Sequence, residues 1–209
     1  MFLKSFKEFK SVYGIAVMGL LIGISMMLET FTISFPMFKI NFAFLSVAAI
    51  GMLFGPVVGI FGGMLSDVLG WVVHPDGPFL PLYTLVGGLQ GFIYGYVLYH
   101  KNKETNFFGK KKTPEFTLKN KSEKLGGKSF VAKVIIARLL DVVVINMFIN
   151  TYLNIHYGFI PYESMTFIIA TRTVKNLLEF VVDVPMLLVV LPAAFVAYKT
   201  VVRKRNRQV

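Results

Sequence analysis

Cysteine is absent from the 209-residue chain, and that absence excludes disulfides, thiolate metal sites and thiol nucleophiles. Histidine is almost as scarce, and His74, His100 and His156 lie far apart at the ends of apolar segments. Charged residues make up only 16% of the chain, against roughly 25% in an average soluble domain. We therefore expect an integral membrane protein that binds no metal ion and no cofactor.

Motifs for catalysis are missing as well. The sequence has no phosphate-binding loop of the G-x-x-x-x-G-K-[ST] type, so the chain is not expected to hydrolyse ATP itself. It shows no nucleophile beside a base and no pair of carboxylates at catalytic spacing. We expect a protein that is not an enzyme.

Apolar sequence is what the chain has in abundance, with 55% hydrophobic residues. Its apolar segments predict an all-α membrane protein with six transmembrane helices, forming a single membrane domain over residues 1–209. Several of the segments are short for a span, which predicts short or tilted helices. The predicted spans are 12–28, 40–54, 56–73, 81–99, 132–153 and 166–198.

The formal net charge of +11 comes from basic residues that cluster between the spans. They precede the first span, fill the Lys-rich segment 101–131, and follow the last span. Positively charged segments mark the cytoplasmic side of a membrane protein. Both termini and a cytoplasmic linker over 101–131 are therefore expected inside the cell, as an even number of spans requires. The same clustering argues against nucleic-acid binding.

Five polar residues interrupt the last apolar segment, in the stretch I-I-A-T-R-T-V-K-N-L-L-E-F-V-V-D-V-P (168–185). Their spacing of i, i+3, i+4, i+7 and i+11 puts them on one face of a helix. Each ionisable group in hydrocarbon costs roughly 2.5–3.5 kcal/mol on insertion scales, so this face predicts a functional site. The alternative is a structural network, for example an ion pair between Lys175 and Glu179. The five residues are Arg172, Lys175, Asn176, Glu179 and Asp183.

Alternating span directions allow the polar residues to be sorted by depth. Cations, amides and aromatic rings in the outer half suit a small organic anion, and they do not suit an ion pore. Arg138 and Asp141, in the inner half, are interpreted as a structural pair. The candidate substrate contacts are Lys39, Asp67, Trp71, Phe79, Tyr83, Gln90, Asn146, Asn150, Arg172, Lys175 and Asn176.

Three of these candidates, Trp71, Asn146 and Asn150, have a purely structural alternative. Trp71, the only tryptophan, suits the membrane interface on its own account. Asn146 and Asn150 continue to Asn154 at intervals of four, and such a series either joins helices or hydrogen-bonds a polar ligand. Both interpretations remain open from the sequence.

Small residues recur on the first predicted span. Ala16, Gly19 and Gly23 lie on one helical face, and Gly19-x-x-x-Gly23 permits close contact between helices. This face either packs inside the molecule or contacts another membrane subunit. We take these three residues as the candidate partner interface.

Five motifs, in order along the chain, resemble the S components of energy-coupling factor (ECF) vitamin transporters of the folate type. The resemblance implies a six-helix substrate-binding subunit in a bacterial plasma membrane. Such subunits join a membrane coupling subunit and two cytoplasmic ATPases. The motifs are K-I-N-F-A-F-L-S-V-A-A-I-G-M-L-F-G-P (39–56), G-G-M-L-S-D-V-L-G (62–70), G-P-F-L-P-L-Y-T-L (77–85), G-F-I-Y-G-Y-V-L-Y (91–99) and R-T-V-K-N (172–176).

The resemblance leaves the vitamin open between folate and pantothenate, which are both carboxylates. Three outer cations with Trp71, Phe79 and Tyr83 favour folate, since rings suit its pterin and cations its glutamate. Pantothenate needs fewer rings and one cation. Two further classes are a self-sufficient secondary transporter, for which no convincing internal repeat is found, and a membrane scaffold without a ligand.

Overall fold

The protein is described by a computed structural model that covers residues 5, 12–31, 33–34, 39–75, 77–99, 127–159 and 165–205. Nearly all of this is helical, and the predicted all-α class is confirmed. The helices are α2 (Val12–Thr30), α3 (Phe44–Phe54), α4 (Pro56–Val73), α5 (Pro81–Leu98), α7 (Lys128–Leu140), η1 (Asp141–Ile149), α8 (Asn150–His156) and α9 (Met165–Arg205).

A short antiparallel pair, β1 (Ile33–Ser34) and β2 (Lys39–Ile40), follows α2 and was not predicted from the sequence. The predicted linker 101–131 lies outside the described residues, except for 127–131. Four of those last residues already belong to α7, which begins at Lys128 rather than at 132.

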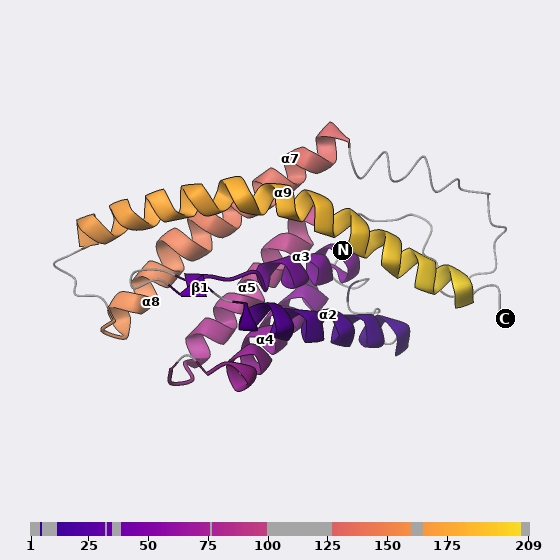
Figure 1. Ribbon diagram of the computed structural model, residues 1–209, viewed down its shortest axis with the longest axis horizontal. Coiled ribbons are helices and arrows are strands. Elements are labelled where there is room, and N and C mark those ends of the chain that lie inside the picture. Colours follow the sequence, from indigo (N-terminus) through magenta and orange to yellow (C-terminus); the bar gives the residue numbers. More distant parts are fainter. Residues whose placement is uncertain are drawn as a thin grey trace.

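The described helices form six rods, because α7, η1 and α8 follow one another without a break. Figure 1 shows α9 running along the long axis of the molecule, with the rod of α7, η1 and α8 crossing it and α2–α5 gathered on one side. The 41 residues of α9 include Pro185 and Pro192. At 1.5 Å per residue such a helix is about 60 Å long, roughly twice the hydrocarbon thickness of a bilayer.

Two of the described helical stretches are long and apolar enough to cross a membrane by themselves, Pro56–Val73 and Arg172–Thr200. Two shorter apolar helical stretches are Gly14–Thr30 and Phe44–Phe54. The lengths agree with the expectation of short or tilted helices.

Three residues form the break between α3 and α4: Gly55 and Pro56, which are adjacent in sequence, and Ser5, which hydrogen-bonds to residues on either side of them. Gly55 adopts a φ of 91°, a conformation that suits glycine, and Pro56 starts α4 at a position where a missing N–H does no harm. Ser5 closes the break: its hydroxyl donates to the Phe54 carbonyl at 2.8 Å and accepts from the Val58 amide at 3.2 Å. The ends of both helices are thereby satisfied in the buried interior.

Glycines bring α4 and α5 into backbone contact. A Cβ built on Gly63 would lie 2.1 Å from the carbonyl oxygen of Gly87, far inside van der Waals contact. A Cβ on Gly95 would lie 2.6 Å from the Cα of Pro56. Contacts this close exist only because these positions have no side chain, so the glycines fix how α4 and α5 cross.

Candidate substrate-binding site

A cavity of about 200 Å³ lies between the helices, and charged and polar side chains line much of it. Its walls come from every rod of the bundle, so residues far apart in the sequence meet there. The lining residues are Ser25, Glu29, Asn41, Ala43, Phe44, Val47, Gly63, Ser66, Asp67, Gly87, Gln90, Arg138, Asn146, Lys175, Glu179 and Asp183.

One wall carries carboxylates and hydroxyls from α2 and α4. Glu29 accepts a hydrogen bond from Asn41 Nδ2 at 2.7 Å, and Asp67 accepts one from the Thr84 hydroxyl at 2.7 Å. Asn41 is itself held by the amide of Ala43, which donates to Asn41 Oδ1 at 2.6 Å. Each carboxylate is thus positioned by a neighbouring element and presented to the cavity.

A second part of the lining belongs to an ionic network centred on Arg138. Arg138 is only 4% exposed, and its guanidinium forms ion pairs with both Asp141 and Asp183. These pairs join the rod of α7, η1 and α8, which we call the central rod, to α9. It also lies 4.4 Å from the centroid of the Phe44 ring. The predicted pair of Arg138 and Asp141 is confirmed, and Asp183 is its third member.

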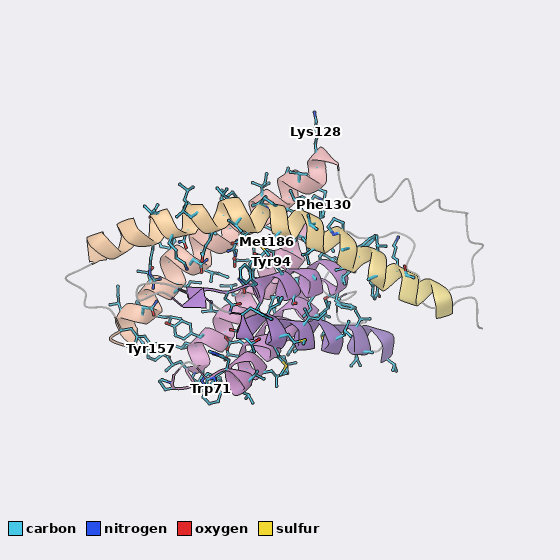
Figure 2. All side chains as sticks on the ribbon, viewed as in Figure 1. Trp71, Tyr94, Lys128, Phe130, Tyr157 and Met186 are labelled. Carbon is cyan, nitrogen blue, oxygen red and sulfur yellow. The ribbon has the colours of Figure 1, made fainter. Side chains whose placement is uncertain are left out.

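Two neutral side chains complete this network. Gln90 Nε2 donates to both carboxylate oxygens of Asp141, at 3.1 and 3.2 Å, and the Tyr94 hydroxyl donates to Asp141 at 3.3 Å. Figure 2 shows Tyr94 near the middle of the molecule, away from its ends. A charge buried this deeply is tolerated because it is paired and hydrogen-bonded on several sides.

Lys175 reaches the same cavity from α9. Its ammonium lies 3.2 Å from a carboxylate oxygen of Glu179, one helical turn further on, and both side chains are mostly buried. The sequence offered this pair as the structural alternative to a ligand site. Both residues line the cavity, so the ion pair and the candidate site share the same place.

The π-helix η1 determines which side chains the central rod presents. In a π-helix each hydrogen bond spans five residues rather than four, so residues five apart lie above one another. Asp141 and Asn146 are five apart, and on η1 Asn146 lines the cavity while Asp141 accepts a hydrogen bond from Gln90, which also lines it. On an α-helix the same two residues would point in different directions.

Four of the predicted contacts therefore line the cavity: Asp67, Gln90, Asn146 and Lys175. Lys39 belongs to β2, two residues before Asn41, and its side chain lies outside the described part of the chain. Three more candidates are near the cavity without lining it: Asn150, Arg172 and Asn176.

Of these three, Arg172 joins α9 to the rod of η1 and α8, and Asn150 bonds within that rod. Arg172 donates to the Thr151 hydroxyl at 3.1 Å and to the Asn146 carbonyl at 3.5 Å. Asn150 donates to Asn146 Oδ1 at 3.1 Å. Asn176 is 4% exposed, and its Nδ2 has no hydrogen-bond partner among the described residues. Their roles as ligand contacts stay predictions.

The predicted aromatic contacts lie where α4 ends and α5 begins, and they are not among the residues that line the cavity. Trp71 Nε1 donates to the Gly77 carbonyl at 2.9 Å, and the Trp71 ring packs 5.3 Å from Phe79. Tyr83 stacks on Tyr157 at 6.1 Å. Figure 2 shows Trp71 and Tyr157 toward the same end of the molecule, opposite Lys128. Phe44 is the aromatic ring that lines the cavity.

The asparagine series divides between the two roles that the sequence left open. Asn146 lines the cavity. Asn154 joins helices, because its Nδ2 donates to the Asn150 carbonyl at 2.7 Å and its Oδ1 accepts from the Tyr83 hydroxyl at 2.9 Å.

The candidate substrate contacts omit part of the lining. Arg138 was interpreted as a member of a structural pair, and Glu179 and Asp183 were expected on the polar face of the last span without being counted as substrate contacts, yet all three line the cavity. Others were overlooked because a serine, or a carboxylate or amide at the end of an apolar segment, is a weak signal in an apolar sequence. These are Ser25, Glu29, Asn41 and Ser66.

Comparisons with known proteins agree on one family. The family described as "ECF transporter, substrate-specific component" matches residues 14–191. The folate transporter FolT of Clostridium novyi (strain NT) is 29% identical over 150 residues, which are 71% of this chain and 70% of that protein. The crystal structure of FolT bound with folic acid superposes with a TM-score of 0.60 at 26% identity, covering 88% of this chain and 94% of that one.

Proposed function

The chain belongs to the family of ECF transporter substrate-specific components, and on this premise we propose that its cavity captures folate from outside a bacterial cell. The observation that carries the proposal is a cavity with two chemically distinct walls inside an apolar bundle. One wall offers carboxylates and hydroxyls, which accept N–H donors. The other carries Lys175 and Arg138 beside Glu179 and Asp183. Arg138 is already paired with two aspartates, so Lys175 is the cation that would attract a ligand carboxylate.

Folate has the matching polarity. Its pterin ring carries N–H donors at one end, and its glutamate carries carboxylates at the other. The cavity of about 200 Å³ is smaller than the roughly 300–1,000 Å³ of sites that enclose a drug-sized molecule. It therefore suits one end of an elongated ligand, with the remainder extending toward the outer loops. The likeness to two FolT proteins supports the same ligand.

Transport requires partners, since ATP hydrolysis has to take place on other chains. We propose that the subunit joins a membrane coupling subunit and two cytoplasmic ATPases, with both termini and segment 101–131 in the cytoplasm of the cell. The α2 face of Ala16, Gly19 and Gly23 is the candidate contact. Around Gly19 and Gly23 no described atom lies within 4 Å of where a Cβ would be, and Leu20 between them is 65% exposed.

Three measurements test the proposed function. The purified protein should bind folate tightly in isothermal titration, and mass spectrometry of the untreated sample should identify folate or a reduced folate as its bound molecule. Pantothenate or another vitamin in that sample would contradict the assignment of folate as the ligand. Vesicles that hold this chain alone should show no uptake, and uptake in them would indicate a self-sufficient transporter.

The docking face has its own test. Gly19→Trp should leave folate binding unchanged, because Gly19 does not line the cavity, and should abolish assembly with the coupling subunit. Val189→Trp is the matched control on α9, since Val189 is 73% exposed and lies on no proposed interface. Equal loss of assembly in both variants would exclude α2 as the docking face.

A further inference from the structure

Two buried serines in the cavity wall have unused hydroxyls. Ser25 is fully buried and Ser66 is 4% exposed, and both line the cavity. The Oγ atom of each has no hydrogen-bond partner among the described residues. A serine inside a helix can satisfy its hydroxyl on the carbonyl four residues back, and neither does so here. Buried polar atoms are nearly always paired, so these two hydroxyls indicate where a ligand binds.

The same wall holds two carboxylates close to the serines. Glu29 is one turn after Ser25 on α2, and Asp67 is next to Ser66 on α4. The Glu29 carboxylate lies over α4, since a Cβ on Gly70 would meet its Cδ at 3.2 Å. Gly70 is one turn after Ser66. The four side chains therefore form one patch, which we call the acceptor wall: Ser25, Glu29, Ser66 and Asp67.

The chemistry of the acceptor wall selects one kind of molecular edge. Carboxylates only accept hydrogen bonds when ionised, whereas a hydroxyl both donates and accepts. A ligand that satisfies this wall needs adjacent N–H donors, with a ring nitrogen or carbonyl oxygen beside them as acceptor. A 2-amino-4-oxopyrimidine edge has this arrangement in one plane. A carboxylate group has no N–H donors, and its negative charge would be repelled by Glu29 and Asp67.

We propose that the acceptor wall recognises the aminopyrimidine edge of the ligand and thereby determines specificity. The inference rests on the proposed function and assigns an orientation to the ligand. The heterocycle faces α2 and α4, and the carboxylate end lies toward Lys175 on α9. Hydrogen bonds to charged groups are the stronger ones in proteins, so Glu29 and Asp67 contribute more to discrimination than the two serines.

The test compares folate with an analogue in which methyl replaces the 2-amino group. In the wild-type protein the ratio of the two dissociation constants should be tenfold or more, about the loss expected for one bond to a charged group. Glu29→Gln and Asp67→Asn should reduce this ratio to near one, and Ser25→Ala and Ser66→Ala should reduce it by a smaller factor. The ratio is measured within each variant, so partial loss of folded protein cancels.

Two controls make the result specific. Ser46 is 3% exposed on α3 and lies outside the cavity, so Ser46→Ala should keep the wild-type ratio. Lys175→Gln should weaken folate and its analogue equally and leave the ratio unchanged. If folate binds and all four acceptor-wall variants keep the wild-type ratio, this inference is wrong and the proposed function stands. If the wild-type protein does not bind folate, both are wrong.

Discussion

Gly59 and Gly91 face one another across α4 and α5 so closely that a Cβ built on Gly91 would lie 1.9 Å from the Gly59 carbonyl oxygen. A Cβ on Gly59 would in turn lie 2.3 Å from the Gly91 carbonyl oxygen. Neither neighbour is a flexible side chain that could move aside. The contact of these two backbones holds the wall that carries Asp67 against the wall that carries Gln90.

Gly91→Ala is therefore expected to force α4 and α5 apart and to lower the free energy of unfolding by about 3 kcal/mol, at the upper end of overpacking effects. Thermal unfolding in detergent measures the loss. Gly19→Ala is the matched control, because no described atom lies within 4 Å of its Cβ position. There the better helix propensity of alanine should leave stability unchanged or slightly higher. Equal stability of the two variants would contradict the role of the glycine contact.

The helices were predictable because long apolar runs end at glycine and proline. Pro56 and Pro81 each start a helix at the predicted position. Lys175 and Asp67 were predictable as cavity residues because ionisable groups are rare in membrane helices and face the interior.

The rest of the site depends on how the helices rotate and cross, which the sequence does not display. Ser25 looks like an ordinary small helix residue until its neighbours are known. Trp71 and Phe79 were expected to contact the ligand, but they pack against each other at the end of α4. Asn146 reaches the cavity on a π-helix, whereas the regular spacing of the asparagines predicts an ordinary α-helix with 3.6 residues per turn.

Arg138 is expected to be essential for stability only while its two partners are charged. Arg138→Gln leaves Asp141 and Asp183 buried without their cation, which should cost about 3–5 kcal/mol of the free energy of unfolding. Replacing all three residues, with Arg138→Gln, Asp141→Asn and Asp183→Asn together, should recover most of that loss. Thermal unfolding of the single and triple variants decides it. A triple variant as unstable as Arg138→Gln would show that the guanidinium acts through packing alone.

Lys175 and Glu179 are expected to have opposite effects on folate affinity. The carboxylate of Glu179 lies 3.2 Å from the Lys175 ammonium and competes with a ligand carboxylate for it. Lys175→Gln should weaken folate binding by about tenfold, which is about 1.4 kcal/mol. Glu179→Gln should leave the affinity unchanged or increase it, since a competing negative charge is removed. Isothermal titration of both variants measures this, and a similar loss in both would instead make Glu179 a ligand contact.

The π-helix leads to a prediction about the effect of deleting one residue from η1. Deleting one residue between Asp141 and Asn146 reduces their spacing from five to four. If η1 then becomes an ordinary α-helix, the two side chains again face the same way, because i and i+4 are neighbours on an α-helix. Val144 is the residue to delete, since it lies between them and is 37% exposed.

Deletion of Val144 should therefore retain folate binding within about tenfold, or 1.4 kcal/mol. Deletion of Ile136 is the control, because it is 51% exposed but lies in the regular α-helix α7. Removing it rotates the preceding residues by about 100° relative to those that follow, which separates the buried Val134 from Ala137 and should abolish binding. Titration with folate compares the two deletions. Loss of binding in both would mean that the cavity needs the π-helical geometry itself, and not only the shared direction of Asp141 and Asn146.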